Sequence, residues 1–159
     1  MNATMTKFDA HERLDGMTTF RELRNGSLDR VPRGPGIYVV LAPERGIQIT
    51  PTSCGGRFKQ KDPTVAIDVL RARMVEGAPV VYIGKANNLK RRIREFADFG
   101  AGKPIGHWGG RYIWQIEGCQ DLTIGWIATP DEDPREVERR LIAEFAREFG
   151  RPPFANISA

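Results

Sequence analysis

Two short apolar segments constrain the fold more than any other feature of this chain: GIYVV at residues 36–40 and VVYIG at residues 80–84. Both are rich in β-branched and aromatic residues and carry a glycine at one end, which is typical of β-strands. Because side chains alternate between the two faces of a strand, pairing of these strands would let Tyr38 and Tyr82 converge on one side of a sheet. A tyrosine at a strand centre is more often a core residue than a catalytic one, so both interpretations stay open at this point.

The remaining segments predict helices and strands around this pair. Residues 19–22, Thr-Phe-Arg-Glu, fit a capping box, which indicates that a short helix begins there. Asp133 and Pro134 have the spacing of an N-cap followed by a proline at the first helical position, and Gly150 predicts the end of that helix. We expect further helices at residues 64–75 and 89–99, and further strands at residues 111–116 and 122–129.

This order of elements predicts a small mixed α/β domain. Residues 1–30 are interpreted as a polar N-terminal segment with a short helix, and residues 31–159 as a single domain. Residues 41–79 separate the first two strands, are rich in turn-forming residues, and are interpreted as an insertion.

The overall composition excludes several classes of protein. No apolar run approaches the length of a membrane span, and the N-terminus lacks the apolar stretch of a secretory signal, so we expect a cytoplasmic protein. The two cysteines, Cys54 and Cys119, have no metal-ligand spacing; reduced thiols are expected, and a disulfide between them stays possible. A net charge of +4 is a weak indication of a polyanionic partner such as nucleic acid.

The last predicted helix carries a carboxylate on its apolar face. At about 100° per residue, one wide face collects the apolar residues Val137, Leu141, Ile142, Phe145 and Phe149. Glu138 falls near the middle of that face, where an ionised carboxylate is costly unless it is paired or binds a metal. Glu138 is therefore either one half of an ion pair with a core arginine or a metal ligand.

The helix expected at residues 89–99 follows a run of basic residues. Between residues 85 and 94 the chain contains five cations and no acid: Lys85, Lys90, Arg91, Arg92 and Arg94. Arg92 lies at the edge of the apolar stripe that Phe96 shares, whereas Lys90, Arg91 and Arg94 spread over an exposed arc. These cations either form a solvated face, with Arg92 reaching past the stripe to water, or bind phosphate groups.

An ordered set of motifs resembles the GIY-YIG endonuclease family, which includes homing endonucleases and the nuclease subunit of bacterial excision repair. Gly36-Ile37-Tyr38 and Tyr82-Ile83-Gly84 match its two name-giving motifs, and Lys85, Asn88, Leu89 and Arg92 follow with the spacing of the repair enzymes. Glu138 with Leu141-Ile142 resembles the glutamate helix of the family, and Pro153-Phe154-Ala155-Asn156 resembles its closing asparagine motif. The resemblance covers residues 34–158.

The resemblance implies a fold and an activity. The fold is an α+β domain, with a small central sheet of three antiparallel strands flanked by helices. The activity is divalent-metal-dependent hydrolysis of DNA phosphodiester bonds, in repair, recombination or restriction. Glu138 would be the ligand of one Mg²⁺ or Mn²⁺ ion, Arg92 would contact the scissile phosphate, and Tyr38 would be the general base or position the water, with Tyr82 as its partner. Lys85 would lie near the site and Asn156 would brace it. Separately from the resemblance, the basic run predicts DNA contacts at Lys85, Lys90, Arg91 and Arg94. The glycine-rich loop either adds contacts at His107 and Arg111 or is a turn anchored by Trp108.

The chemistry expected of these residues is consistent with their types. A tyrosine has a pKa of about 10 in water, and the neighbouring cations Lys85 and Arg92 are expected to favour the phenolate of Tyr38. The planar guanidinium of Arg92 can donate two hydrogen bonds to one phosphate. A P-loop motif is absent from the sequence, so no nucleotide cofactor is expected.

The sequence also departs from the family pattern. The gap between the two tyrosine motifs is longer than usual, and Phe96 occupies a position where the family often has His or Tyr; His107 could supply a polar group instead. Glu144 has a spacing to Asn156 closer to that of the repair enzymes, but Glu138 is preferred because it lies on the apolar face. The alternative function is a nucleic-acid-binding module that keeps this fold without cleaving. The sequence indicates neither the DNA target nor the oligomeric state.

Overall fold

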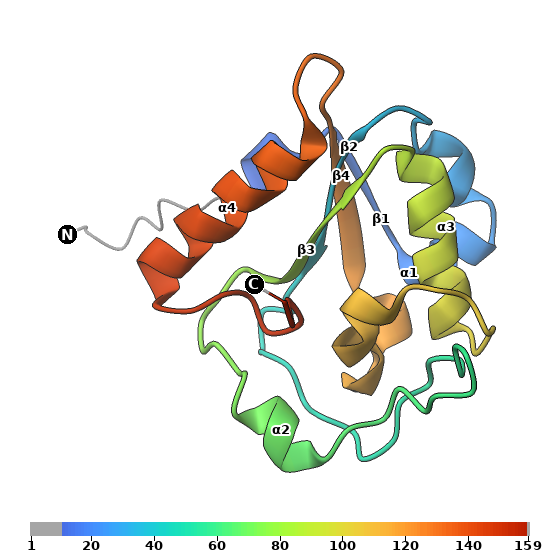
Figure 1. Ribbon diagram of the computed structural model, residues 1–159, viewed down its shortest axis with the longest axis vertical. Helices are drawn as coiled ribbons and strands as arrows, with labels where there is room; N and C mark the ends of the chain where they lie inside the picture. Colours follow the sequence, from blue (N-terminus) through green and yellow to red (C-terminus); the bar gives the residue numbers. More distant parts are fainter. Residues whose placement is uncertain (1–10, 159) are drawn as a thin grey trace.

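The computed structural model describes residues 11–158, which form a twisted antiparallel sheet with helices on both faces (Figure 1). Within these residues the sheet has four strands in the order β1-β4-β2-β3. The strands are β1 (Gly16–Thr19), β2 (Gly36–Leu41), β3 (Val80–Ala86) and β4 (Thr123–Ala128). The α-helices are α1 (Phe20–Arg24), α2 (Ile67–Arg71), α3 (Leu89–Gly100) and α4 (Pro134–Phe149). The 3₁₀ helices are η1 (His11–Arg13), η2 (Ser27–Arg30), η3 (Trp108–Gln115) and η4 (Cys119–Asp121).

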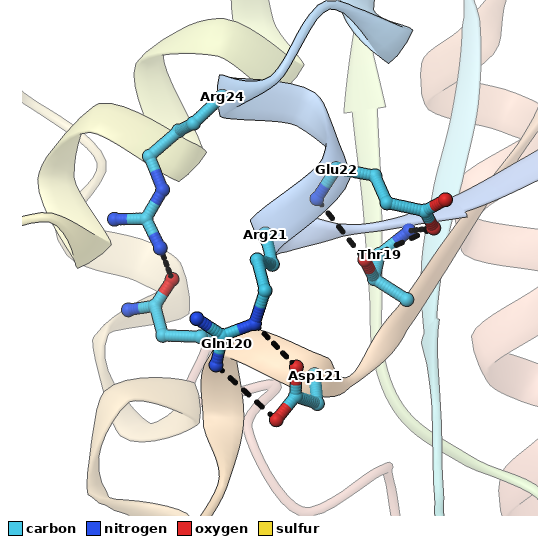
Figure 2. A network of polar contacts seen from close by, with 6 residues as sticks. All are labelled: Thr19, Arg21, Glu22, Arg24, Gln120 and Asp121. Atoms are coloured by element: carbon cyan, nitrogen blue, oxygen red, sulfur yellow. Dashed lines mark hydrogen bonds and ion pairs between the residues drawn. The ribbon is translucent and has the colours of Figure 1, made fainter.

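The predicted helix caps are confirmed. The hydroxyl of Thr19 accepts a hydrogen bond from the backbone of Glu22, whose side chain accepts one from the backbone of Thr19, so α1 begins with a capping box (Figure 2). Asp133 caps α4, with Pro134 at its first position, and Gly150 ends the helix with a left-handed φ of 82°. These local signals therefore lie where the sequence predicted them, at the start of α1 and at both ends of α4.

The sheet separates two apolar clusters. On one face, α4 covers β2 and β3, where Val137, Leu141 and Phe145 pack on the strands. On the other face, α1, α3 and η3 cover a larger cluster that includes both motif tyrosines. The alternation along β2 explains this division, because Ile37 and Val39 face α4 whereas Tyr38 and Val40 face α3.

Three sequence predictions about the elements are wrong in detail. The described sheet has four strands rather than three, because β1, from the segment assigned to the polar N-terminus, pairs with β4. Residues 111–116, expected as a strand, lie largely in the 3₁₀ helix η3, where consecutive residues from Tyr112 to Gln115 are all buried. The helix expected over residues 64–75 is the shorter α2, which has no side-chain cap.

The segment 41–79 wraps around η3 rather than standing apart from the domain. Ile49 forms an isolated bridge with Ile116, and the buried amide of Gln115 bonds the segment at two points. Its Oε1 accepts from the backbone N–H of Val65 at 2.9 Å, and its Nε2 donates to the carbonyls of Val65 and Thr50 at 3.0 and 3.1 Å. This one buried side chain satisfies three backbone groups of the segment and so ties the segment to η3.

Candidate active site

Antiparallel pairing of β2 with β3 brings the two motif tyrosines together. Tyr38 lies opposite Gly84 and Val40 lies opposite Tyr82, so both phenol rings project from the same face with their centroids 6.0 Å apart. Gly84 is required by this packing, because a Cβ at that position would collide with the ring of Tyr38. The predicted convergence of Tyr38 and Tyr82 is thus confirmed.

Burial dominates the acid–base properties of both phenols. Tyr38 is 1% exposed and Tyr82 is 8% exposed. Burial raises the pKa of Tyr38 well above its usual value, and the opposing effect of the Arg92 charge is smaller. Burial likewise raises the pKa of Tyr82 to about 12, and the negative charge of Glu138 also acts in that direction. The expected stabilisation of a Tyr38 phenolate by neighbouring cations is wrong for this conformation, because desolvation outweighs it.

His107 is the hydrogen-bond partner of Tyr38. The Tyr38 hydroxyl and the Nε2 atom of His107 lie 2.7 Å apart, and the imidazole stacks on Phe96 with centroids 3.9 Å apart. His107 is fully buried, and burial lowers its pKa well below the usual value, so the ring is neutral. Its Nδ1 atom has no hydrogen-bond partner among the described residues. The expectation that His107 contacts DNA is wrong here, because the residue lies in the core.

Arg92 joins α3 to the loop that carries His107. Its Nη1 donates to the carbonyl of Gly106 at 2.8 Å and to the carboxylate of Glu95 at 3.1 Å. About a third of the Arg92 side chain remains exposed, and its positive charge acts on both Tyr38 and Tyr82. Arg92 can therefore hold the loop and still offer donors to an anion.

Glu138 lies across the edge strand β3 from the phenols and close enough for its charge to act on Tyr82. Burial raises its pKa, and the charges of Lys85 and Arg135 oppose the shift. The predicted alternative of an ion pair with a core arginine is wrong within the described residues, because Glu138 makes no ion pair within 4 Å there. Glu144, the other candidate, instead pairs with Arg13 at 3.3 Å.

Asn156 clamps the free edge of β3 beside Tyr82. Its Oδ1 accepts from the backbone N–H of Ile83 at 3.0 Å, and its Nδ2 donates to the carbonyl of Ile83 at 2.8 Å. The preceding residue, Ala155, donates its backbone N–H to the carbonyl of Val81 at 2.8 Å. The C-terminal segment thus extends the sheet by one short, buried contact, and the side chain of Asn156 replaces a neighbouring strand.

The predicted DNA-contacting cations differ in how free they are. Lys85, Arg91 and Arg94 are exposed, and Arg91 pairs with Glu95 at 3.5 Å. Lys90 is partly buried and lies 3.7 Å from Asp29. Arg111 is partly buried and stacks on two aromatic rings, with its guanidinium 4.8 Å from the Trp108 centroid. The exposed cations are available to a phosphate backbone, whereas Arg111 holds η3 together.

The segment 41–79 also brings a basic hairpin against the His107 loop. Lys61 donates its backbone N–H to the carbonyl of Phe58, and Lys59 and Gln60 between them have left-handed φ values of 52° and 65°. Such strain in non-glycine residues costs of order 1–3 kcal/mol each. Phe58 packs against Gly106, so this turn is fixed to the loop that Arg92 holds. The sequence showed the charge of this segment but not its position, because no local pattern predicts that contact.

Comparison of the chain with protein-family models finds no match. Neither a curated protein nor a solved structure matches it. The resemblance to the GIY-YIG family therefore rests on the residues and on where they lie.

Proposed function

We propose that this protein is a metal-dependent endonuclease of the GIY-YIG type, which hydrolyses DNA phosphodiester bonds. The observation that carries the proposal has two parts. Tyr38, Tyr82 and Arg92 meet on one face of the sheet, and the charge of Glu138, which makes no ion pair with another described residue, acts on Tyr82 from the α4 side. Structural packing alone explains the phenols, but it does not explain a half-buried glutamate that makes no ion pair with any residue from 11 to 158.

Glu138 fits a single divalent cation by its chemistry. Mg²⁺ is often held by one or two carboxylates and several waters, so the site needs no cluster of acids. Burial raises the pKa of Glu138, and a bound cation would relieve that penalty. When bound, Mg²⁺ would supply stabilisation of negative charge on the phosphate and the leaving oxygen.

The remaining residues bind and orient the substrate in this proposal. Exposed Lys85 attracts the phosphate, and Arg92 donates hydrogen bonds to it from the exposed part of its side chain. Tyr82, the more exposed of the two phenols, positions the attacking water. Tyr38 packs against Tyr82, and the neutral imidazole of His107 fixes the Tyr38 hydroxyl through their hydrogen bond.

Plasmid cleavage tests the proposal with a matched pair of variants on one helix. With Mg²⁺ or Mn²⁺, the wild-type protein is expected to nick or linearise plasmid DNA. Glu138→Gln is expected to lose at least 100-fold in rate, about 3 kcal/mol of transition-state stabilisation. Glu144→Gln removes a carboxylate that pairs with Arg13 and is expected to cleave at the wild-type rate. Equal cleavage by wild type and Glu138→Gln would contradict the proposal.

One observation favours the alternative of a DNA-binding module without cleavage. Tyr38 is 1% exposed, so the residue that the family resemblance assigns as base has no contact with solvent in this conformation. The two functions differ in what Glu138→Gln does. A module would bind duplex or branched DNA with unchanged affinity in the variant and would leave plasmid intact in wild type. Glu138-dependent cleavage would exclude the module.

A further inference from the structure

The only two cysteines of the chain meet in the structure although they are 65 residues apart. The Sγ atoms of Cys54 and Cys119 lie 3.5 Å apart, and both thiols are free. Cys54 is exposed and belongs to the segment 41–79, whereas Cys119 is 8% exposed and begins η4. One accessible thiol therefore stands in contact with one protected thiol.

The exposed thiol contacts Gln120, which belongs to a polar network with Arg24, and the neighbouring pair Arg21 and Asp121 lies beside it (Figure 2). Gln120 donates from Nε2 to the Sγ of Cys54 at 3.7 Å and to the carbonyl of Gly100 at 3.0 Å. Its Oε1 accepts a hydrogen bond from the guanidinium of Arg24 (Figure 2), which leaves the Nε2 donor for the sulfur. The neighbouring Arg21 bonds Asp121 instead, at 2.7 Å, and makes no hydrogen bond to either sulfur.

This arrangement separates the two thiols in reactivity. The hydrogen bond from Cys119 is the largest influence that lowers the pKa of Cys54 to about 7, and the Gln120 amide and the Arg24 charge act in the same direction. The hydrogen bond to Cys54 and burial raise the pKa of Cys119. Because the thiolate is the nucleophile in thiol–disulfide exchange, Cys54 reacts first and Cys119 follows.

We propose that Cys54 and Cys119 form a reversible intramolecular disulfide by exchange with a small-molecule disulfide. The Cys54 thiolate attacks one sulfur of that disulfide, breaks its S–S bond and releases one thiolate, which leaves a mixed disulfide on Cys54. Cys119 then loses its proton to the released thiolate and attacks Cys54 Sγ, expelling the second small thiol. Two protein thiols are oxidised and one small-molecule disulfide is reduced to two thiols.

The bond would change how the segment 41–79 is held. The sulfurs need to approach by about 1.5 Å to reach a bonding distance near 2.05 Å. Next to them, Cys54 donates its backbone N–H to the carbonyl of Trp114 at 3.1 Å, and Gly56 donates to Phe99 at 2.9 Å. The disulfide would add a covalent link between this segment and η4, at a place where the backbone is already fixed on both sides. The oxidised protein is therefore expected to melt several degrees higher than the reduced protein.

Mass spectrometry of the full chain tests the proposal. The purified protein is equilibrated with glutathione buffers of increasing disulfide content, quenched with acid and treated with N-ethylmaleimide under denaturing conditions. Reduced protein is expected to carry two maleimides, and oxidised monomer to carry none and no glutathione. Reduction of the oxidised protein with dithiothreitol before labelling is expected to restore the reaction of both cysteines with maleimide. Two maleimides throughout, a stable glutathione adduct on Cys54 beside a free Cys119, or a disulfide-linked dimer would each overturn the proposal.

Variants test the order of the two steps. In Cys119→Ser, the glutathione adduct on Cys54 is expected to accumulate, because no second thiol can expel the glutathione. If the variant has the circular dichroism spectrum of the wild type but forms no adduct, the proposed order, in which Cys54 reacts before Cys119, is overturned. Gln120→Ala is expected to slow alkylation of Cys54 by iodoacetamide at neutral pH several-fold, because a donor to the thiolate is lost. Arg21 lies next to this network but bonds Asp121 and not Gln120, so Arg21→Gln is the matched control. Cys54 in this variant is expected to be alkylated at the wild-type rate. Equal rates for Gln120→Ala and Arg21→Gln would exclude activation by the amide.

Discussion

Replacement of Asn156 by alanine is expected to destabilise the protein by about 2–3 kcal/mol. The change removes two hydrogen bonds to the backbone of Ile83, at 3.0 and 2.8 Å, each worth about 1 kcal/mol net. It also leaves a buried N–H and a buried C=O without partners, which adds to the loss. Because β3 is an edge strand, water can reach part of the vacated contact, and this keeps the expected value below the sum of two full desolvation penalties.

Urea unfolding followed by circular dichroism measures this loss. With a slope of about 1–3 kcal/mol per molar urea, the midpoint is expected to fall by roughly 0.7–3 M, with an unchanged slope. Asn87→Ala, an exposed asparagine just after β3, is the control and is expected to change stability by less than about 0.5 kcal/mol. A loss below about 0.5 kcal/mol in Asn156→Ala would refute the view that the side chain replaces a strand at this edge.

Three further outcomes are expected. Burial lowers the pKa of His107, so the unfolded chain takes up a proton near pH 6.5 that the folded chain does not. The urea midpoint is therefore expected to fall as the pH drops below about 6.5. In His107→Gln this fall of the midpoint with pH is expected to be smaller. Tyr38→Phe is expected to abolish cleavage while DNA affinity stays near wild type, as compared by gel shift and plasmid assay; retained cleavage would exclude an essential hydroxyl. Joint replacement of Arg57, Lys59 and Lys61 by serine is expected to weaken DNA binding. The slope of log affinity against log salt concentration is expected to become shallower by about one unit per lost phosphate contact. An unchanged slope would show that these three residues do not contact the DNA.

The sequence predicted those parts of the fold that depend on neighbours along the chain. The capping box at Thr19, the Asp133-Pro134 start and the Gly150 stop are made by residues close together in the chain, so they can be recognised without knowledge of tertiary contacts. The convergence of Tyr38 and Tyr82 followed from strand alternation and the assumption of pairing. The extent of α3 was predicted to within one residue, because its apolar stripe has a strong helical period.

The parts that were missed depend on contacts between distant segments. The strand β1 is short and mixed in character, and only its pairing with β4 defines it. The 3₁₀ helix η3 contains Tyr112, Ile113 and Trp114 in sequence, and a run of apolar residues cannot by itself separate a buried strand from a buried helix. The pairing of Tyr38 with His107, across 69 residues, has no local signal at all.

The sequence also could not predict that Tyr38, the candidate base, is buried, and this burial changes the expected chemistry. Neighbouring cations lower the pKa of a phenol only when desolvation does not outweigh them. At Tyr38 the ring is enclosed by Tyr82, Phe96 and His107, so the desolvation of a phenolate is the larger effect. The more exposed Tyr82, on the edge strand and within the field of Glu138, is therefore the phenol better placed to meet water and a phosphate.

The segment 41–79 packs against the elements that carry the tyrosine site and is not a separate appendage. It contacts the His107 loop through Phe58 against Gly106, α3 through Gly56 to the Phe99 carbonyl, and η3 through the amide of Gln115. Each contact lies on an element that also holds His107 or Arg92, so a change in the segment acts on the residues around Tyr38. It follows that deletion of residues 44–76 would perturb the tyrosine site as well as remove basic surface. Oxidation of Cys54, two residues before Gly56, would act on the same elements without removing any of them.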